Sequence, residues 1–271
     1  MLSIIITTKN EESNIRRLIN SVKKNCYFDY EILVIDNFSI DNTRSISEEE
    51  GAIVYNCGPE RSAQRNYGAK ISKYNHLLFF DADMEVVNKI FFEQVESMIK
   101  SFVKAAYIRE NIIKEGIIGK IRNYERQLYD ITDNNCPRLI DKDLFFEIGC
   151  FNTNLTGFED WELNNKIKIK NYKIIYIKEK INHYEEEVTF IKTAKKKAYY
   201  LFNSQKLGNE FKSQHQTGII FRIIGIYFYR ENFLKTLKNP FIFFLTFFYK
   251  NIQILMIILL YLLQKINLLK N

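Results

Sequence analysis

The sequence predicts an α/β protein whose mostly parallel sheet is covered by helices on both faces. Short apolar runs alternate with amphipathic segments over the first part of the chain, as strands alternate with crossover helices. The runs are almost continuously apolar, which is typical of strands buried on both faces of a sheet. The chain has 271 residues, of which 46% are apolar, so it is long enough for a sizeable core and is not a disordered chain.

The elements of the first part follow a regular order. We expect strands within LSIIITTKN, YEILVIDNFS, AIVYN and NHLLFF, and helices over Glu12 to Lys24, Asp41 to Glu50 and Arg61 to Ser72. In the first helix, Ile15, Leu18, Ile19 and Val22 share one face. In the third, small residues such as Gly68 permit close packing against the sheet.

The pattern loosens after Val87, although further elements can be predicted. Helices are expected over Asn88 to Phe102 and Gly119 to Asp130, then a strand or loop and a short helix within CPRLIDKDLFFEIGCF. A helix begins within GFEDWELNNKIKIK, a strand lies in YKIIYIKEKINHYEEE with His183 in a polar segment after it, and a last helix covers Val188 to Lys206.

Polar clusters stand at the carboxyl ends of three predicted strands. They are Thr7 to Glu11, Asp36-Asn37 and Asp81-Ala82-Asp83. Asp81 and Asp83, taken alone, fit either a solvated turn or a site for a divalent cation. Ligands of open parallel sheets bind beyond the carboxyl ends of the strands, so the agreement of three clusters favours a functional site.

The net charge of +7 belongs entirely to the last part of the chain. Residues 212–271 carry eight basic residues and one acid, and residues 1–211 are neutral. The same segment is the most apolar, and bulky apolar runs broken by Lys and Arg suit an anionic membrane surface. Nucleic acid is not an expected partner, because the basic residues alternate with large aliphatic ones. We therefore expect a catalytic domain over 1–211 and a membrane-associated helical tail over 212–271.

The tail leaves several topologies open. Phe241 to Leu263 is long enough to span a bilayer, but Lys250, Asn251 and Gln253 lie near its middle. We favour in-plane or re-entrant helices over a single span. A buried helical pair is the third possibility, and one so rich in Phe, Ile and Leu would need a protein partner to cover it.

Four scattered cysteines, Cys26, Cys57, Cys136 and Cys150, form no CxxC pair or finger spacing. They are interpreted as reduced, mostly packed thiols. Met1 leads directly into a strand pattern, with no basic and apolar signal sequence before it. We therefore expect the protein at the cytoplasmic face of the cell membrane.

Five segments resemble, in the expected order, family 2 glycosyltransferases, which have a GT-A fold and use nucleotide-sugar donors. They are SIIITTKNEESNI, EILVIDNFSIDNT, RSAQRNYGAKIS, FFDADM, which matches the DxD element, and GFEDWELNNKIK, which resembles the acceptor-side ED motif. The resemblance covers residues 3 to about 200, with a donor half over 1–87 and an acceptor half over 88–211. Asn37 replaces a commoner second Asp, and Lys9 replaces an aromatic residue. The tail is similar to that of membrane-associated members.

The resemblance implies roles for residues at the strand ends. Thr7, Glu11 and Asp36 would hold the nucleoside, whose base is uracil or guanine. Arg61 or Arg65 would pair with the diphosphate; the alternative for each is an exposed helix arginine.

The DxD element implies a metal. Asp81 would hold the ribose or the donor sugar, and Asp83 would ligate Mn²⁺ or Mg²⁺, hard cations that take oxygen ligands. His183 is either a further ligand, which would favour Mn²⁺, or a surface histidine near a run of glutamates.

The ED motif implies the acceptor side. Asp160 would be the general base, with Glu159 or Glu162 as alternatives, while Trp161 would line the acceptor site or belong to the core. Acids in a first helical turn are also explained by helix capping.

The function implied is inverting, metal-dependent transfer of a sugar to a lipid-linked, polyprenyl-type or glycan acceptor. The rivals are a polyprenyl-phosphate monosaccharide synthase, a sugar-nucleotide pyrophosphorylase and a non-catalytic membrane scaffold. ITTKNEES lacks the glycine-rich nucleotide loop expected of a pyrophosphorylase.

Overall fold

A computed structural model describes residues 1–130, 135–155, 157, 159–185, 189–204 and 224–269. The chain forms two compact units. Unit 1 comprises Met1–Asn111, Asp133–Asn154 and Phe158–Tyr184, and unit 2 comprises Ile112–Thr132, Leu155–Gly157 and Glu185–Asn271.

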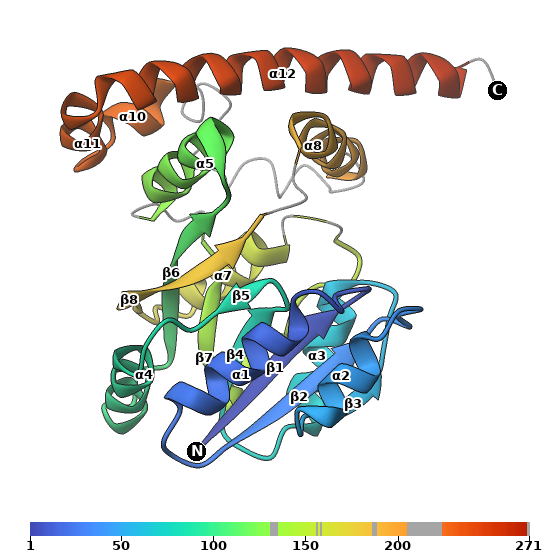
Figure 1. Ribbon diagram of the computed structural model, residues 1–271, viewed down its shortest axis with the longest axis vertical. Coiled ribbons are helices and arrows are strands. Elements are labelled where there is room, and N and C mark those ends of the chain that lie inside the picture. Colours follow the sequence, from blue (N-terminus) through green and yellow to red (C-terminus); the bar gives the residue numbers. More distant parts are fainter. Residues whose placement is uncertain (131–134, 156, 158, 186–188, 205–223, 270–271) are drawn as a thin grey trace. The chain divides into compact units, whose positions relative to one another are not determined.

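Unit 1 is built on a mixed sheet whose eight strands follow the order β3-β2-β1-β4-β7-β6-β8-β5 (Figure 1). The strands are β1 (Leu2–Thr8), β2 (Tyr30–Asp36), β3 (Ile53–Asn56), β4 (His76–Asp81), β5 (Met84–Glu85), β6 (Ala105–Ile113), β7 (Pro137–Asp141) and β8 (Ile174–Tyr184). Strands β1 to β4 are parallel, as predicted. The pairs β4–β7, β6–β7 and β5–β8 are antiparallel.

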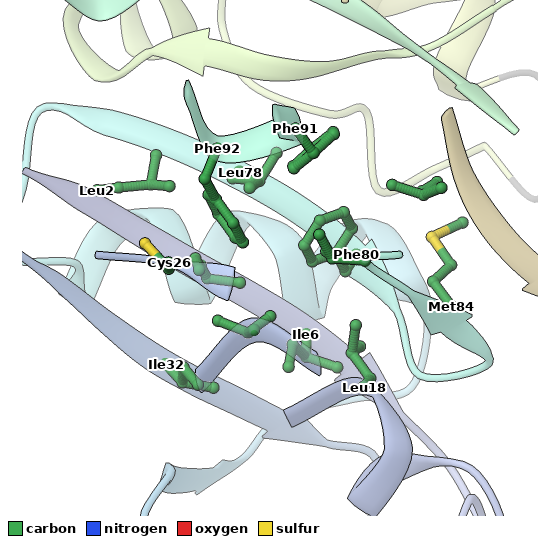
Figure 2. Packing of buried hydrophobic residues seen from close by; sticks show 14 of the residues in the cluster. Leu2, Ile6, Leu18, Cys26, Ile32, Leu78, Phe80, Met84, Phe91 and Phe92 are labelled. Carbon is green, nitrogen blue, oxygen red and sulfur yellow. The ribbon is translucent and has the colours of Figure 1, made fainter. Parts of the chain in front are cut away.

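Alternating side chains of the buried strands supply two cores, one on each face of the sheet. Ile4 and Ile6 of β1 join the core that contains apolar residues of α1 (Ile15–Asn25) and α4 (Ile90–Lys100), part of which Figure 2 shows. Ile5 joins the other core, with residues of α3 (Arg61–Ile71), α6 (Lys142–Glu147) and α7 (Glu159–Ile169). Successive strand residues point to opposite faces, so the apolar run of β1 serves both cores. This confirms helices on both sides of the sheet.

Close packing of α3 on the sheet depends on Gly68. A Cβ atom there would lie 2.5 Å from Cγ2 of Ile5 and 3.1 Å from Cγ1 of Ile35. We expect Gly68→Val to lower the free energy of unfolding by about 1–3 kcal/mol, because overpacking outweighs the helix propensity gained by removing glycine. Urea denaturation measures this. Exposed Lys70 of the same helix provides the control, Lys70→Ala, which should be near neutral; equal stability of both variants would contradict tight packing at Gly68.

Three elements differ from the prediction. No strand was predicted between Phe102 and Gly119, where β6 lies, because Arg109 and Glu110 interrupt its apolar run. The two-residue strand β5 was not predicted either, because it is too short to show a pattern. His183, expected after the strand, lies inside β8 and pairs in register with Met84.

Unit 2 contains the helices α5 (Gly116–Tyr129), α8 (Phe190–Ser204), α10 (Ile226–Phe228), α11 (Asn232–Lys238) and α12 (Pro240–Leu269). Tyr124 and Leu128 of α5 form a small core with Ile226 and Tyr227, against which Phe243 and Phe247 of α12 pack. The expected boundary near residue 211 therefore does not coincide with this division, because α5 and α8 pack with the tail. The short polar helix predicted at Asp41 to Glu50 is α2 (Thr43–Glu49), which belongs to unit 1.

Candidate active site

The polar ends of β1, β2 and β4 meet at the carboxyl edge of the sheet, as predicted. Thr7 lies opposite Asp81 in the register of β1 and β4, and Thr8 lies opposite Asp36 in that of β1 and β2. Burial raises the pKa of Glu11, and the nearby Asp83 and Asp81 raise it further. The edge therefore gathers the acids that the sequence placed on separate segments.

Asp81 lies between buried Arg65 and largely buried Arg138. Nη2 of Arg65 donates to its Oδ1 at 3.0 Å, and Nη2 of Arg138 donates to its Oδ2 at 2.9 Å. Burial would raise the pKa of Asp81, but Arg138 and Arg65 hold it well below its ordinary value. The interpretation of Asp81 as a residue in a solvated turn is therefore wrong.

Arg65 joins Asp81 to the ED motif. Its Nη1 donates to Oδ1 of Asp160 at 3.0 Å, so one planar guanidinium holds two carboxylates from α7 and β4. Burial opposes the ionisation of Asp160, but Arg65, with Arg61 and Arg138, lowers its pKa below the ordinary value. Asp160 is 37% exposed as a side chain while Arg65 is 2% exposed. The buried guanidinium of Arg65 thus holds the ionised carboxylate of Asp160, which is partly accessible to solvent.

The second acid of the DxD element pairs with the predicted histidine. Nε2 of His183 lies 3.2 Å from Oδ2 of Asp83, and Nδ1 lies 2.9 Å from Oε2 of Glu110. Burial alone would lower the pKa of His183, but the hydrogen bonds to Asp83 and Glu110 raise it to about 10. The structure therefore places His183 beside Asp83 and Glu110; of the glutamates that follow it in the sequence, Glu186 and Glu187 lie outside the described residues.

Asp83 and His183 fit part of a divalent metal site. Oδ1 of Asp83 is buried without a hydrogen-bond partner, and an imidazole nitrogen lies beside Oδ2. Among the described residues, no group of three or more His, Cys, Asp and Glu side chains has the arrangement of a metal site. Two protein ligands fit a cation whose other ligands are donor oxygens and water. His183 would ligate as a neutral imidazole, so binding would displace its proton.

The remaining residues of the ED motif differ in burial. Glu159 is 3% exposed, and its Oε1 lies 3.5 Å from Nη2 of Arg61. Burial and the neighbouring Asp160 raise the pKa of Glu159. Glu162 pairs with Lys166 one turn along α7. Trp161 is half-buried and does not belong to either core of unit 1, so it remains a predicted acceptor-side residue.

The nucleoside-side residues are held by local hydrogen bonds. Asp36 is 1% exposed and accepts from the Thr8 hydroxyl at 2.8 Å and from the Ser39 backbone N–H at 2.8 Å. The Glu11 carboxylate accepts from the Asn14 amide at 2.8 Å. These bonds order the turns after β1 and β2, and the nucleoside contacts of Thr7, Glu11 and Asp36 stay predictions.

Two residues of this network, Arg138 and Glu110, were not predicted from the sequence; their side chains are 11% and 3% exposed. Arg138 on β7 donates to Oε1 of Glu110 on β6 at 3.1 Å as well as to Asp81. Opposite charges inside otherwise apolar strands were the available signal, because such residues are rarely buried unless paired. Together the ion pairs connect Asp160, Arg65, Asp81, Arg138, Glu110, His183 and Asp83 in this order.

Comparison with known proteins identifies the family. A sequence model of glycosyl transferase family 2 matches residues 3–155, which is more than half of the chain. The chain belongs to glycosyl transferase family 2. The resemblance noted in the sequence is thereby confirmed for the first four of its segments, while Asp160 and His183 of this family 2 chain lie beyond the matched residues.

Curated relatives of this family 2 chain include an uncharacterized protein and two glycosyltransferases with different named substrates. An uncharacterized glycosyltransferase of Rickettsia bellii is 30% identical over 68% of the chain and 59% of the relative. The UDP-Glc:alpha-D-GlcNAc-diphosphoundecaprenol beta-1,3-glucosyltransferase WfgD of Escherichia coli is 30% identical over 50% of the chain and 56% of its own length. The poly(ribitol-phosphate) beta-N-acetylglucosaminyltransferase TarP of Staphylococcus aureus is 26% identical over 63% of the chain and 53% of its own. The chain thus spans little more than half of each of these relatives.

Solved structures confirm the GT-A-like fold. The mannosyltransferase PcManGT from Pyrobaculum calidifontis, in complex with GDP-Man and Mn²⁺, aligns with a TM-score of 0.60 at 18% identity, over 90% of this chain and 72% of that one. S. aureus TarS 1-349 in complex with UDP-GlcNAc aligns with a TM-score of 0.57 at 18% identity, over 90% and 79%.

Proposed function

We propose that this protein is an inverting glycosyltransferase that moves a sugar from a UDP- or GDP-linked donor to a hydroxyl of a lipid-linked or glycan acceptor. The observation that carries the proposal is the series of ion pairs that joins Asp83 to the partly exposed carboxylate of Asp160 in unit 1. It supports a single site with Asp83 and His183 on the donor side and Asp160 as the base.

In the proposed reaction, Asp160 takes the proton of the acceptor hydroxyl. The hydroxyl oxygen then bonds to the anomeric carbon of the donor while the bond from that carbon to the diphosphate oxygen breaks. Arg65 keeps the Asp160 carboxylate ionised and oriented, since it holds Oδ1 from the buried side. Such a base contributes about 10²- to 10⁴-fold to the rate.

The leaving diphosphate needs positive charge on the other side. Asp83 and His183 would hold Mn²⁺ or Mg²⁺, which when bound stabilises the charge on the diphosphate. Arg61, at 43% exposure, is the more accessible of the two arginines predicted for this role, because both terminal nitrogens of Arg65 already contact carboxylates.

The direct test is a screen of UDP- and GDP-sugars for Mn²⁺-dependent transfer and donor hydrolysis, with EDTA as control. Acceptors should include a polyprenyl-diphosphate sugar and a bare polyprenyl phosphate. Transfer to the sugar hydroxyl supports the proposal, whereas transfer to the phosphate alone would identify a polyprenyl-phosphate monosaccharide synthase. Formation of sugar nucleotide and diphosphate from a sugar phosphate and UTP would instead identify a pyrophosphorylase.

The lipid-linked acceptor rests partly on α12, which has two different faces. Thr246, Lys250 and Gln253 are buried on one face, where Lys250 lies 3.5 Å from Oε1 of Glu125 and donates to the Tyr129 hydroxyl at 3.1 Å. Gln253 accepts from Lys197 at 2.6 Å. Of the three polar residues that disfavoured a membrane span, Lys250 and Gln253 thus have partners on α5 and α8, while Asn251 donates to the carbonyl of Phe247 in α12 itself at 2.7 Å.

The opposite face of α12 is apolar and exposed. It presents Phe241, Phe244, Phe248, Ile252, Leu255, Leu259 and Leu262, each between 48% and 71% exposed. Among the described residues, the segment Pro240–Leu263 is the one helix long and apolar enough to cross a membrane. Because one face is bound by protein, we propose that α12 lies in the plane of the cytoplasmic leaflet, with exposed Lys238 of α11 near anionic head groups.

The membrane proposal predicts that Phe248→Glu combined with Leu255→Glu releases the protein from vesicles that contain phosphatidylglycerol. Burial of the two side chains in lipid is worth about 3 kcal/mol or more, so affinity should fall by roughly 10²-fold or more. Vesicle sedimentation measures this. Ile40→Glu combined with Phe102→Glu is the matched control, because these residues of unit 1 are 92% and 86% exposed. Unchanged sedimentation of the α12 variant would contradict the proposal.

A further inference from the structure

Glu110 is a buried carboxylate that is connected to both acids of the DxD element, each through one intervening side chain. It is 2% exposed, and its Oε1 accepts from Nε of Arg138 at 3.1 Å. Its Oε2 lies 2.9 Å from Nδ1 of His183. Through Arg138 it reaches Asp81, and through His183 it reaches Asp83.

We infer that Glu110 is a positioning residue for metal-dependent donor binding. This inference rests on the proposed function. In the neutral ring that would ligate a cation, the Glu110 carboxylate accepts the Nδ1–H of His183, which leaves Nε2, directed at Asp83, available to the cation. A carboxylate that accepts a hydrogen bond from the other ring nitrogen of a metal-ligating histidine orients the ring and increases its basicity. Arg138 is held by the same carboxylate, so the guanidinium that binds Oδ2 of Asp81 is oriented as well.

The two oxygens of Glu110 make Glu110→Gln a sharp test. Both partners of the carboxylate are donors when His183 carries a proton on Nδ1, and an amide offers only one accepting oxygen. Nε of Arg138 always donates, so it takes that oxygen and leaves the amide NH₂ facing Nδ1. Nδ1 must then accept, which places the ring proton on Nε2 and removes the metal ligand.

The experiment measures Mn²⁺ binding by electron paramagnetic resonance in the presence of UDP or GDP, whichever the unchanged protein binds. Mn²⁺ affinity should fall about 10- to 100-fold in Glu110→Gln, as for other carboxylates behind metal-bound histidines. Binding of the nucleotide in EDTA, measured by calorimetry, should stay unchanged. A residue with only a structural role would alter both or neither.

Glu125→Gln is the matched control, because Glu125 is also a buried carboxylate, paired with Arg122 and Lys250 in unit 2. Its Mn²⁺ affinity should equal that of the unchanged protein. If Glu110→Gln does not fold, Glu110→Asp replaces it. Because Glu110→Asp keeps a carboxylate, its Mn²⁺ affinity should fall by less than the loss expected for Glu110→Gln.

The possible outcomes distinguish failure of the role inferred for Glu110 from failure of the proposed metal site. Wild-type Mn²⁺ affinity in a folded Glu110 variant overturns the positioning role while the metal site stands. Absence of nucleotide-dependent Mn²⁺ binding in the unchanged protein overturns the metal site, and the role of Glu110 with it.

Discussion

Asp83→Ala is expected to abolish metal-dependent donor binding and to reduce transfer to background. The side chain supplies a buried oxygen without a hydrogen-bond partner and a second oxygen 3.2 Å from Nε2 of His183. With two protein ligands proposed, the loss of one leaves the cation with a single imidazole. Calorimetry with UDP or GDP, in Mn²⁺ and then in EDTA, measures the effect.

The fold of the Asp83 variant should survive, because Asp83 is 30% exposed as a side chain and contributes no apolar contact to the cores. Asp143→Ala is the control, since Asp143 is an exposed acid of α6 in the same unit. Near-normal transfer by Asp83→Ala in the presence of EDTA would show that the metal assignment is wrong.

Asp160→Asn is expected to lower kcat by roughly 10²-fold or more while donor affinity barely changes. Asparagine keeps the shape and an oxygen that can accept from Nη1 of Arg65, but it cannot take a proton from the acceptor. Steady-state kinetics with varied acceptor, together with donor binding by calorimetry, separates the two quantities.

Glu162→Gln serves as the control for Asp160→Asn, because Glu162 lies in the same helical turn and pairs with Lys166. Its turnover should stay close to that of the unchanged protein. Normal turnover with lost donor binding in Asp160→Asn would place Asp160 on the donor side. Glu159, whose pKa is raised by burial and by Asp160, would then be the next candidate for the base.

Much of the donor half was predictable because its signals are local. Continuous apolar runs predicted β1, β2, β3 and β4, and polar residues at their ends predicted the carboxyl edge of a parallel sheet. Because β2 and β4 both pair in parallel with β1, Asp36 and Asp81 at their ends lie at the same edge of the sheet. The metal role of Asp81 and Asp83 came from their resemblance to the DxD element, and it stays a prediction.

The sequence also determined the composition of the tail, with its basic excess and its apolar runs. It left open whether Lys250 and Gln253 face lipid, because the periodicity of a helix shows which residues share a face but not what that face contacts. The structure answers this with Glu125, Tyr129 and Lys197. These partners come from α5 and α8, which the sequence assigned to another domain.

Only the tertiary structure decided which charges meet inside unit 1. Arg65 was predicted to be a diphosphate ligand or an exposed helix arginine. It is buried between Asp81 and Asp160, so the second interpretation is wrong, and the first stays a prediction. Arg138 and Glu110 belong to no sequence motif, and from β7 and β6 they connect Asp81 of β4 to His183 of β8. A charge can be buried only where an opposite charge is brought to it. That condition depends on the antiparallel pairing of β4, β7 and β6, which no local pattern records.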